Sequence, residues 1–481
     1  MLSILTKFLC FGLSATLAID PLTIKGSKFF NSKTGNQFYF NGVAYQPEQG
    51  DTKTTQDPLV NNEGCDRDIA VFKDLGINSI RVYSTDYTLN HDYCMNALSK
   101  AGIYVLLDIS TPKHSINREA PAWTTDLYQY YVNKVSAFSK YDNVAGYIIG
   151  NEITNSVNTT QASAFVKAAL RDIKAYLSAN KINIPVGYID NDDDEIRKSL
   201  ISYFNCGDVA NARADFYGVN TYRWCGANAT FQSSGYADMA APFKDYSIPS
   251  IITEYGCNLG ERTFKELDSI LGSDLQDIFS GALMYQYSQE SNNYGIVEVT
   301  YSSPDVKKLA DYDSFKSAVK AANPQGTTLS NYKPNLSIST CPSVGDNWQV
   351  DPKKLPPTPS PNACDCILET LRCVLSDDFD VTDDSETIAA GTAVSNICGS
   401  ADCSAISTDP AKGTFGSFSF CNSTTKLSIA LNTNFVNQKG AASACSFSGF
   451  KTNMLDVNAV SKTDAKTCAS RTGGISGAPA S

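Results

Sequence analysis

Histidine is almost absent from this chain of 481 residues, which contains only His91 and His114. A histidine-rich zinc centre therefore lacks its usual ligands, and we expect neither a metal nor a cofactor. Basic residues are also scarce, because 39 Lys and Arg face 50 Asp and Glu, for a net charge of −11. That balance disfavours nucleic acid or an anionic membrane as a partner and suits a neutral ligand.

Apolar runs long enough to cross a bilayer are missing after the first residues. Residues 1–18, MLSILTKFLCFGLSATLA, combine a lysine, an apolar run and small residues at the end, which predicts a signal peptide cleaved after Ala18. The alternative, an N-terminal anchor helix, fits less well because the run is short. Sequons for N-glycosylation agree with secretion, and they begin at Asn158, Asn228, Asn335 and Asn422.

Tyrosine and tryptophan are absent after residue 363, where cysteines gather instead. Of 15 cysteines, Cys10 lies in the predicted signal peptide, and the even remainder indicates disulfides. Residues 364–470 form a predicted small module, disulfide-rich and mainly helical, whose eight cysteines allow 105 pairings. A Pro-rich linker, residues 346–363, separates it from a larger domain at 19–345, and 471–481 is a predicted flexible tail.

Eight β-rich runs alternate with helix-like stretches before the linker. The clearest helix is TQASAFVKAALRDIKAYL, whose apolar residues recur at helical spacing, and DRDIAVFKDLG ends on the helix-stopping Gly76. Eight runs with helical crossovers predict an α/β fold, a (β/α)₈ TIM barrel. The alternative is a doubly wound open sheet, but no Gly-rich phosphate loop follows the first run.

Two of the apolar runs end on a glutamate. Glu152 follows YIIGN in the fourth run, and Glu254 lies in IITEYG at the end of the seventh. Barrel strands end at the face that carries the active site, so these carboxylates are expected to converge there. Such a pair suits glycoside chemistry, in which one carboxyl protonates the leaving oxygen and the other attacks the anomeric carbon or activates water. The alternative is two unrelated strand-end acids.

The chain resembles the fungal cell-wall β-1,3-glucanosyltransferases of glycoside hydrolase family 72 over residues 21–341. The resemblance rests on blocks such as GVAYQP, CDRDIAVFKDLGINSIRVYS, HDYCMNAL, GNE, DFYGVNTYRWCG, TEYGCN and NNYGIV. The region after the linker resembles the cysteine-rich carbohydrate-binding module of family 43. Family membership would imply a retaining enzyme with Glu152 as acid/base and Glu254 as nucleophile. Its partners would be donor and acceptor β-1,3-glucan chains, the donor cleaved internally and transferred to the acceptor's non-reducing end.

The resemblance also implies a set of substrate-binding residues. Asn151 would contact the sugar beside the cleavage point, and the other matching positions are Tyr83, Asp192, Arg197, Tyr285 and the loop 110–118 with Ser110 and Arg118. Gln46, Asp108 and Tyr222 are weaker candidates, and Tyr222, Trp224 or Tyr294 are candidate stacking platforms for the acceptor.

Structural alternatives remain open for several of these residues. Tyr83 and Tyr285 can be ordinary barrel aromatics, and Asp108 a strand-end capping acid. Arg197 can pair with an acid of its neighbouring DDD run, Trp224 can cover a disulfide at Cys225, and Asn151 can cap a helix.

Family precedent further implies the disulfide pairs. They are Cys65–Cys94, Cys206–Cys341, Cys225–Cys257, Cys364–Cys421, Cys366–Cys468, Cys373–Cys445 and Cys398–Cys403. The module lacks Trp and Tyr for sugar stacking, so stabilising the catalytic domain is its expected main role.

Two further functions stay open at this point, an endo-β-1,3-glucanase and a non-catalytic glycan-binding wall protein. No hydrophobic tail follows the final SGAPAS, so we expect secretion into the wall. The outer face of the plasma membrane would apply only if a longer form received a lipid anchor.

Overall fold

The computed structural model describes residues 19–47, 57–300, 303–456 and 458–476. The predicted signal peptide and the last five residues of the predicted tail lie outside these ranges. No helix within the described residues is long and apolar enough to cross a membrane.

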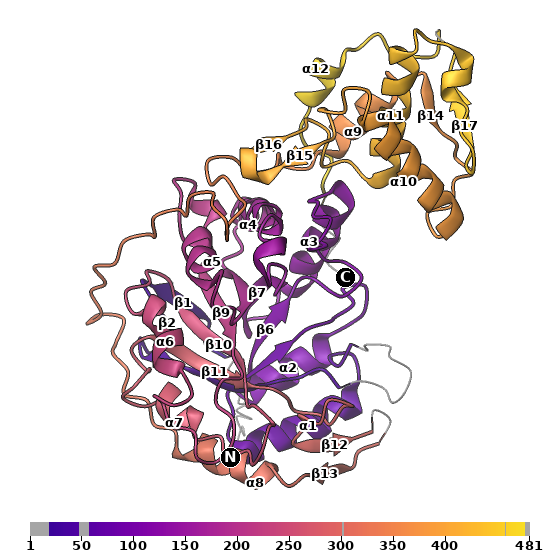
Figure 1. Ribbon diagram of the computed structural model, residues 1–481. Helices are drawn as coiled ribbons and strands as arrows, with labels where there is room; N and C mark the ends of the chain where they lie inside the picture. The colour runs from indigo at the N-terminus through magenta and orange to yellow at the C-terminus, as the bar shows by residue number, and fades with distance from the viewer. Residues whose placement is uncertain (1–18, 48–56, 301–302, 457, 477–481) are drawn as a thin grey trace, which may run out of the picture.

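Eight parallel strands close into a barrel, as the alternating runs predicted, so the open-sheet alternative is wrong (Figure 1). They are hydrogen-bonded in chain order, with the last strand pairing with the first. The strands are β4 (Phe40–Ala44), β5 (Ser79–Val82), β6 (Tyr104–Asp108), β7 (Val144–Asn151), β8 (Val186–Asn191), β9 (Phe216–Asn220), β10 (Ser250–Tyr255) and β11 (Phe279–Met284).

Helices surround the barrel, joined by shorter 3₁₀ turns. They are α1 (Asn62–Leu75), α2 (Asp92–Lys100), α3 (Thr125–Phe138), α4 (Ala162–Ala179), α5 (Arg197–Phe204), α6 (Tyr236–Ala240), α7 (Glu266–Ile270) and α8 (Tyr312–Ala321). The 3₁₀ turns are η2 (Val157–Thr159), η3 (Ala210–Ala212) and η4 (Ala241–Phe243). A three-stranded antiparallel sheet and an antiparallel pair complete this domain. The sheet is β1 (Leu22–Lys25), β2 (Lys28–Asn31) and β3 (Gln37–Phe38), and the pair is β12 (Val297–Val299) and β13 (Val306–Lys308).

Local sequence signals explain the two helices that were predicted most clearly. Asn61 caps α1 by accepting a hydrogen bond from the Gly64 amide, and Gly76 ends the helix in the left-handed region at φ +79°, as expected. The apolar stripe of α4 is buried, which confirms the helical spacing of that segment.

Aromatic side chains plug the amino-terminal end of the barrel. Phe29 of β2 is fully buried and makes edge contacts with Phe40, 5.1 Å between ring centroids. Phe216 of β9 lies inside the barrel, and a side chain at Gly187 would come within 2.5 Å of its ring. Because this end is filled, the opposite rim is where side chains can reach a substrate.

The C-terminal region folds as a second, disulfide-rich unit beside α3 and α4 (Figure 1). Helices dominate it, as expected. Its elements are α9 (Pro361–Leu368), α10 (Asp384–Cys398), α11 (Ser423–Asn437), α12 (Ala465–Ala469), β14 (Cys373–Leu375), β15 (Thr408–Asp409), β16 (Thr414–Phe415), β17 (Thr452–Met454), η5 (Pro410–Lys412) and η6 (Ala442–Cys445).

This unit is held against the barrel by specific contacts. Arg171 of α4 donates to the Pro356 carbonyl at 2.9 Å, and the Thr125 amide of α3 donates to the Phe420 carbonyl at 2.9 Å. Phe415 packs edge-on against Phe165 at 5.9 Å. The segment between the two units therefore runs along the barrel surface.

The part of the chain that the structure describes contains seven disulfides, and they join the same cysteines that the family resemblance implied. They are Cys65–Cys94, Cys206–Cys341, Cys225–Cys257, Cys364–Cys421, Cys366–Cys468, Cys373–Cys445 and Cys398–Cys403. Among the described residues, no group of three or more His, Cys, Asp or Glu side chains is arranged to hold a metal ion.

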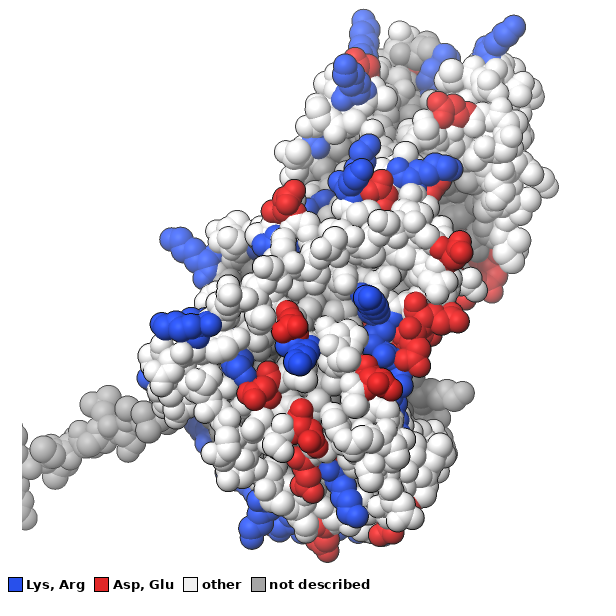
Figure 2. Space-filling view, turned by 60° about the vertical axis from the view of Figure 1, so that its left-hand side comes forward, with Lys and Arg blue, Asp and Glu red and all other residues white. Residues whose placement is uncertain are grey.

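Three of the four sequon asparagines, Asn158, Asn228 and Asn335, are exposed. Asn422 is half-buried, and its side chain caps α11 by accepting from the Thr425 amide. Acidic and basic side chains are interspersed over the face shown in Figure 2.

Candidate active site

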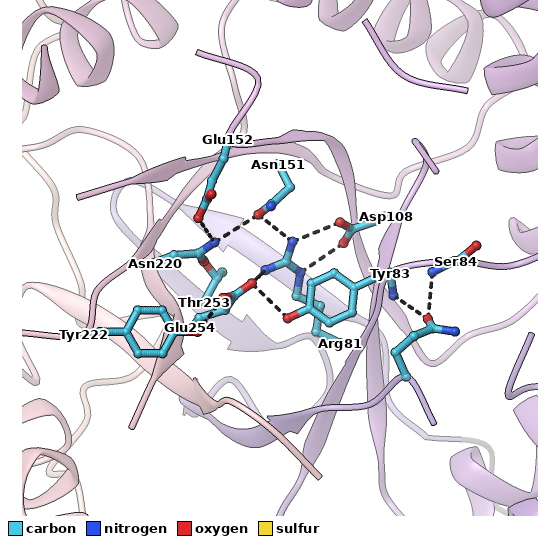
Figure 3. A network of polar contacts seen from close by, with 11 residues as sticks. Arg81, Tyr83, Ser84, Asp108, Asn151, Glu152, Asn220, Tyr222, Thr253 and Glu254 are labelled. Carbon is cyan, nitrogen blue, oxygen red and sulfur yellow. Dashed lines mark hydrogen bonds and ion pairs between the residues drawn. The ribbon is translucent and has the colours of Figure 1, made fainter. Parts of the chain in front are cut away.

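Glu152 and Glu254 lie at the carboxyl ends of β7 and β10, on the rim of the barrel (Figure 3). Glu152 follows the last residue of β7, and its amide donates to the Ile189 carbonyl on the neighbouring strand at 2.9 Å. Its backbone has φ +50°, a left-handed conformation that costs a non-glycine residue about 1–3 kcal/mol and that occurs more often at functional sites than elsewhere. The extended backbone of β7 therefore stops at Asn151, and Glu152 is the first residue outside the strand.

Arg81 connects the acids of the site. This side chain of β5 is fully buried, and its guanidinium donates to both carboxylate oxygens of Asp108, at 3.0 and 2.9 Å. It also donates to Glu254 Oε1 at 3.0 Å and to Asn151 Oδ1 at 2.8 Å (Figure 3). Burial opposes its charge, but the carboxylates of Asp108 and Glu254 outweigh this and raise the Arg81 pKa.

Glu254 is nearly buried, with 8% of its surface exposed. Two phenols donate to it, Tyr83 to Oε1 at 2.9 Å and Tyr222 to Oε2 at 2.7 Å. Burial raises the Glu254 pKa, the Arg81 charge opposes that rise, and the negative charge of Glu152 adds to it. The Glu254 carboxylate is therefore an oriented anion with little water around it, which suits a nucleophile.

Glu152 has a different environment. Its Oε1 accepts one hydrogen bond, from Asn220 Nδ2 at 2.7 Å, and the residue is half-buried. Thr253 donates to Asn220 Oδ1 at 2.8 Å, which fixes the orientation of that amide. Asn220 Nδ2 also reaches Asn151 Oδ1 at 3.1 Å, so Asn151 serves this network and not a helix cap. Two carboxylates in such unequal settings are typical of acid/base and nucleophile roles.

Four tyrosines surround the Glu254 side of the site. Tyr285 lies edge-on to Tyr83 and Tyr222, with ring centroids 6.5 and 6.2 Å apart, and Tyr294 lies 5.6 Å from Tyr222 and 5.3 Å from Tyr285. Trp224 does not belong to this group. Its indole is buried against Tyr236 at 5.4 Å, so it cannot offer a stacking face to a sugar.

A hollow of about 450 Å³ opens beside Asn151 and Ile153, the two chain neighbours of Glu152. It is lined by Tyr83, Asp108, Asn151 and the loop from Ser110 to Glu119, so the loop named in the sequence does border the site. Arg118 reaches back from this loop to the Glu152 carbonyl at 3.0 Å.

Three predicted residues support the site without facing the hollow. Gln46 accepts hydrogen bonds from the amides of Tyr83 and Ser84, at 3.2 and 2.8 Å, and so holds the backbone of Tyr83. Arg197 is nearly buried and pairs with Asp192 at 2.5 Å and with Asp194, which matches the ion-pair alternative. Asp192 also accepts from Thr221 at 2.7 Å and pairs with Arg223.

Arg81 and Asn220 were missed by the analysis of the sequence. A signal existed for Arg81, which interrupts the apolar run NSIRVYS, because a charged residue inside a barrel strand is buried only when it is paired. Asn220 ends the run FYGVN as Glu152 follows YIIGN. Its donation to Glu152 depends on the order of β7, β8 and β9 around the closed barrel, which local sequence does not report.

Arg81→Met is expected to lower kcat/KM about 100-fold and to move the acidic limb of the pH profile upward. If Glu254 reacts as an anion, it must be ionised, and removal of the Arg81 charge leaves only the hydrogen bonds from Tyr83 and Tyr222 to oppose the rise that burial causes in the Glu254 pKa. Arg81→Lys keeps a positive charge but loses the paired guanidinium hydrogen bonds to Asp108. The acidic limb of its pH profile should therefore move less, while kcat still falls. The measurement is kcat/KM from initial rates between pH 3 and 8, together with the melting temperature of each variant. A folded Arg81→Met protein whose acidic limb lies at the wild-type pH would contradict this prediction.

Comparison with protein-family models adds two findings. A model of glycoside hydrolase family 72, described as glucanosyltransferase, matches residues 12–323, and a model described as X8 domain matches residues 371–452. The chain is also 43% identical to Protein EPD1 of Candida maltosa over 435 residues, 90% of this chain and 77% of that protein.

One relative, similar both in sequence and in its solved structure, brings the comparison closer to chemistry. The 1,3-beta-glucanosyltransferase GAS2 of Saccharomyces cerevisiae is 39% identical over 429 residues, 85% of this chain and 75% of that protein. The solved structure of Saccharomyces cerevisiae Gas2p as a Glu-to-Gln mutant, in complex with laminaritetraose and laminaripentaose, superposes with a TM-score of 0.82. That similarity covers 94% of this chain and 97% of the other, at 37% identity.

Proposed function

The chain belongs to glycoside hydrolase family 72, the glucanosyltransferases, and we propose that Glu254 is the nucleophile and Glu152 the acid/base of its reaction. The protein is a 1,3-beta-glucanosyltransferase, and β-1,3-glucan is its substrate. The observation that carries the two roles is the contrast between a buried Glu254, bound by two phenols, and a half-buried Glu152 whose carboxylate accepts a hydrogen bond from Asn220.

In the first step, Glu254 attacks the anomeric carbon of a sugar inside a glucan chain. The bond from that carbon to the leaving oxygen breaks, and Glu152 gives this oxygen its proton. The product is a glycosyl ester on Glu254 and a released fragment that carries the original reducing end. As Glu254 loses its charge in the ester, the phenols of Tyr83 and Tyr222 keep both of its oxygens oriented.

In the second step, the 3-hydroxyl at the non-reducing end of another glucan attacks the same carbon. Its proton passes to Glu152, the ester bond breaks, and a new β-1,3 bond forms with the original configuration. Water competes for the ester, and an oriented acceptor can prevail because effective molarities reach ~10⁵ M or more.

The substrate contacts follow from the position of each side chain. Asn151, Tyr83 and Tyr285 flank the two carboxylates, and Ser110 and Arg118 border the hollow that would receive the glucan. Asp108 acts through Arg81, Gln46 acts through the backbone of Tyr83, and Arg197 acts through Asp192. We expect Gln46 and Arg197 to set geometry without binding sugar directly, whereas Asp108 also lines the hollow.

The site of action is the fungal cell wall, after secretion directed by residues 1–18. The support for this is the apolar start of the chain, the sequons, the disulfides and the wall polysaccharide as substrate. Attachment to the outer face of the plasma membrane would apply to a form that carries a lipid anchor.

A product assay tests the proposed reaction. Purified protein is incubated with a laminari-oligosaccharide of defined length, and products are resolved by chromatography over time. Transfer yields oligosaccharides longer than the starting material together with the shorter released fragment. Only shorter products would indicate an endo-β-1,3-glucanase, and binding without turnover would indicate a glycan-binding protein.

A further inference from the structure

The segment that follows β11 carries two of the four tyrosines around Glu254. Tyr285 and Tyr294 lie nine positions apart on it, and their rings close on Tyr222, which donates to the nucleophile. The backbone of this segment folds back on itself, with the Gln286 amide donating to the Tyr294 carbonyl at 3.2 Å. The position of both rings therefore depends on what holds this backbone.

Arg262 holds it from the neighbouring connection, between β10 and α7. One guanidinium nitrogen donates to the Tyr285 carbonyl at 2.7 Å, and another donates to the Tyr294 carbonyl at 2.8 Å. Asp311 accepts a third contact at 3.3 Å, and the guanidinium also lies over the ring of Tyr294, 5.5 Å from its centroid. A single side chain thus binds the backbone of both tyrosines.

The Arg262 guanidinium lies in a space that is open because residue 256 is a glycine. Arg262 is 6% exposed, and a side chain at Gly256, two residues after Glu254, would come within 2.9 Å of its nitrogen. Gly256 has φ +105°, which further favours glycine there. A buried cation costs free energy unless it is well bound, and the carbonyls of Tyr285 and Tyr294 together with the Asp311 carboxylate offset part of that cost.

A second tie runs between the same two connections. Asn258 Nδ2 donates to the carbonyls of Asn292 and Asn293, at 3.1 and 3.4 Å. Asn292 in turn donates to the Tyr285 hydroxyl at 3.2 Å. Both ties start just after the nucleophile strand and end on the tyrosine segment.

We propose that Arg262 is a positioning residue which holds Tyr285 and Tyr294 against the nucleophile and thereby limits the access of water to the glycosyl-enzyme. This rests on the proposed function, because it concerns the fate of the ester on Glu254. With the segment in place, the acceptor hydroxyl takes the anomeric carbon and its proton goes to Glu152. With the segment loosened, water takes the same carbon, Glu152 takes the proton of water, and the products are hydrolytic.

The test measures how the glycosyl-enzyme is divided between acceptor and water. Arg262→Met and Arg262→Lys are compared with wild type at several acceptor concentrations, and elongated and hydrolysed products are counted separately. We expect the transfer-to-hydrolysis ratio to fall about tenfold in the Met variant and less in the Lys variant, since charged hydrogen bonds to carbonyls are lost. Total donor cleavage should stay within about twofold.

Two further variants keep the test decisive. Arg213→Lys is a matched control, because Arg213 also donates to a backbone carbonyl, that of Gly207 at 2.6 Å, but precedes β9 at the opposite end of the barrel. It should leave the ratio unchanged. Asn258→Ala removes the second tie and should lower the ratio in the same direction by a smaller factor, even if Arg262→Met folds poorly.

The possible outcomes separate this proposal from the reaction itself. An unchanged ratio in folded Arg262 variants, or transfer and hydrolysis falling together with the melting temperature, would overturn the positioning role. If wild type gives no elongated product at all, the proposed transfer reaction fails before Arg262 is in question.

Discussion

Glu254→Gln lowers the elongation of laminari-oligosaccharides by about 10⁴-fold or more, if Glu254 is the nucleophile. An amide cannot supply the anionic oxygen that forms the glycosyl ester. The substitution is nearly isosteric, so Arg81, Tyr83 and Tyr222 still surround the group and the barrel should fold. The measurement is the initial rate of longer products, together with mass spectrometry of the protein for a trapped glycosyl ester, which should be absent.

A matched control is available on the outer surface. Glu298 of β12 is exposed and pairs with Lys307 at 2.7 Å, so Glu298→Gln makes the same chemical change where little stability is at stake. It should retain wild-type rates. A Glu254→Gln protein that melts normally and elongates at near wild-type rate would refute the nucleophile role.

Glu152→Gln is expected to reduce elongation of natural glucan about 10³-fold, and its effect should depend on the leaving group. A glucan oxygen leaves as a poor anion unless it is protonated, whereas an aryl oxide of low pKa leaves without help. With an aryl laminari-oligosaccharide, Glu152→Gln should therefore still form the ester on Glu254. The ester should then accumulate, because no base remains to activate the acceptor.

This leaving-group dependence distinguishes the two glutamates. Glu254→Gln should be inactive on both the natural and the aryl donor, while Glu152→Gln should show a burst of aryl alcohol equal to the enzyme concentration. Equal loss on both donors for Glu152→Gln, without a burst, would mean that Glu152 is not the acid/base.

The barrel could be predicted because local sequence patterns indicate its strands and helices. The runs that became β7 and β10 are short, apolar and followed by polar rim residues, and Gly76 terminates α1 where the helical pattern stops. A strand in a closed parallel barrel is buried on both faces, so it needs a continuous apolar run, and such a run is visible without any knowledge of its neighbours.

Assignments of single side chains were less accessible to the sequence. Trp224 was a reasonable sugar platform by residue type, but it is buried against Tyr236. Arg197 was a substrate-binding candidate through the family resemblance, and only the structure shows its ion pairs with Asp192 and Asp194. Exposure and pairing depend on contacts between distant segments, and residue type alone does not encode them.

The sequence by itself determined the two-part architecture, the disulfide-rich module and the residue types that meet at the rim of the barrel. Only the tertiary structure decided their roles. Closure of the barrel brings Arg81, Asp108, Asn220 and Glu254, from four different strands, into one hydrogen-bonded network. The physical reason is that the ionisation and orientation of a carboxylate depend on its burial and on charges within a few ångströms, and those distances exist only after the chain has folded.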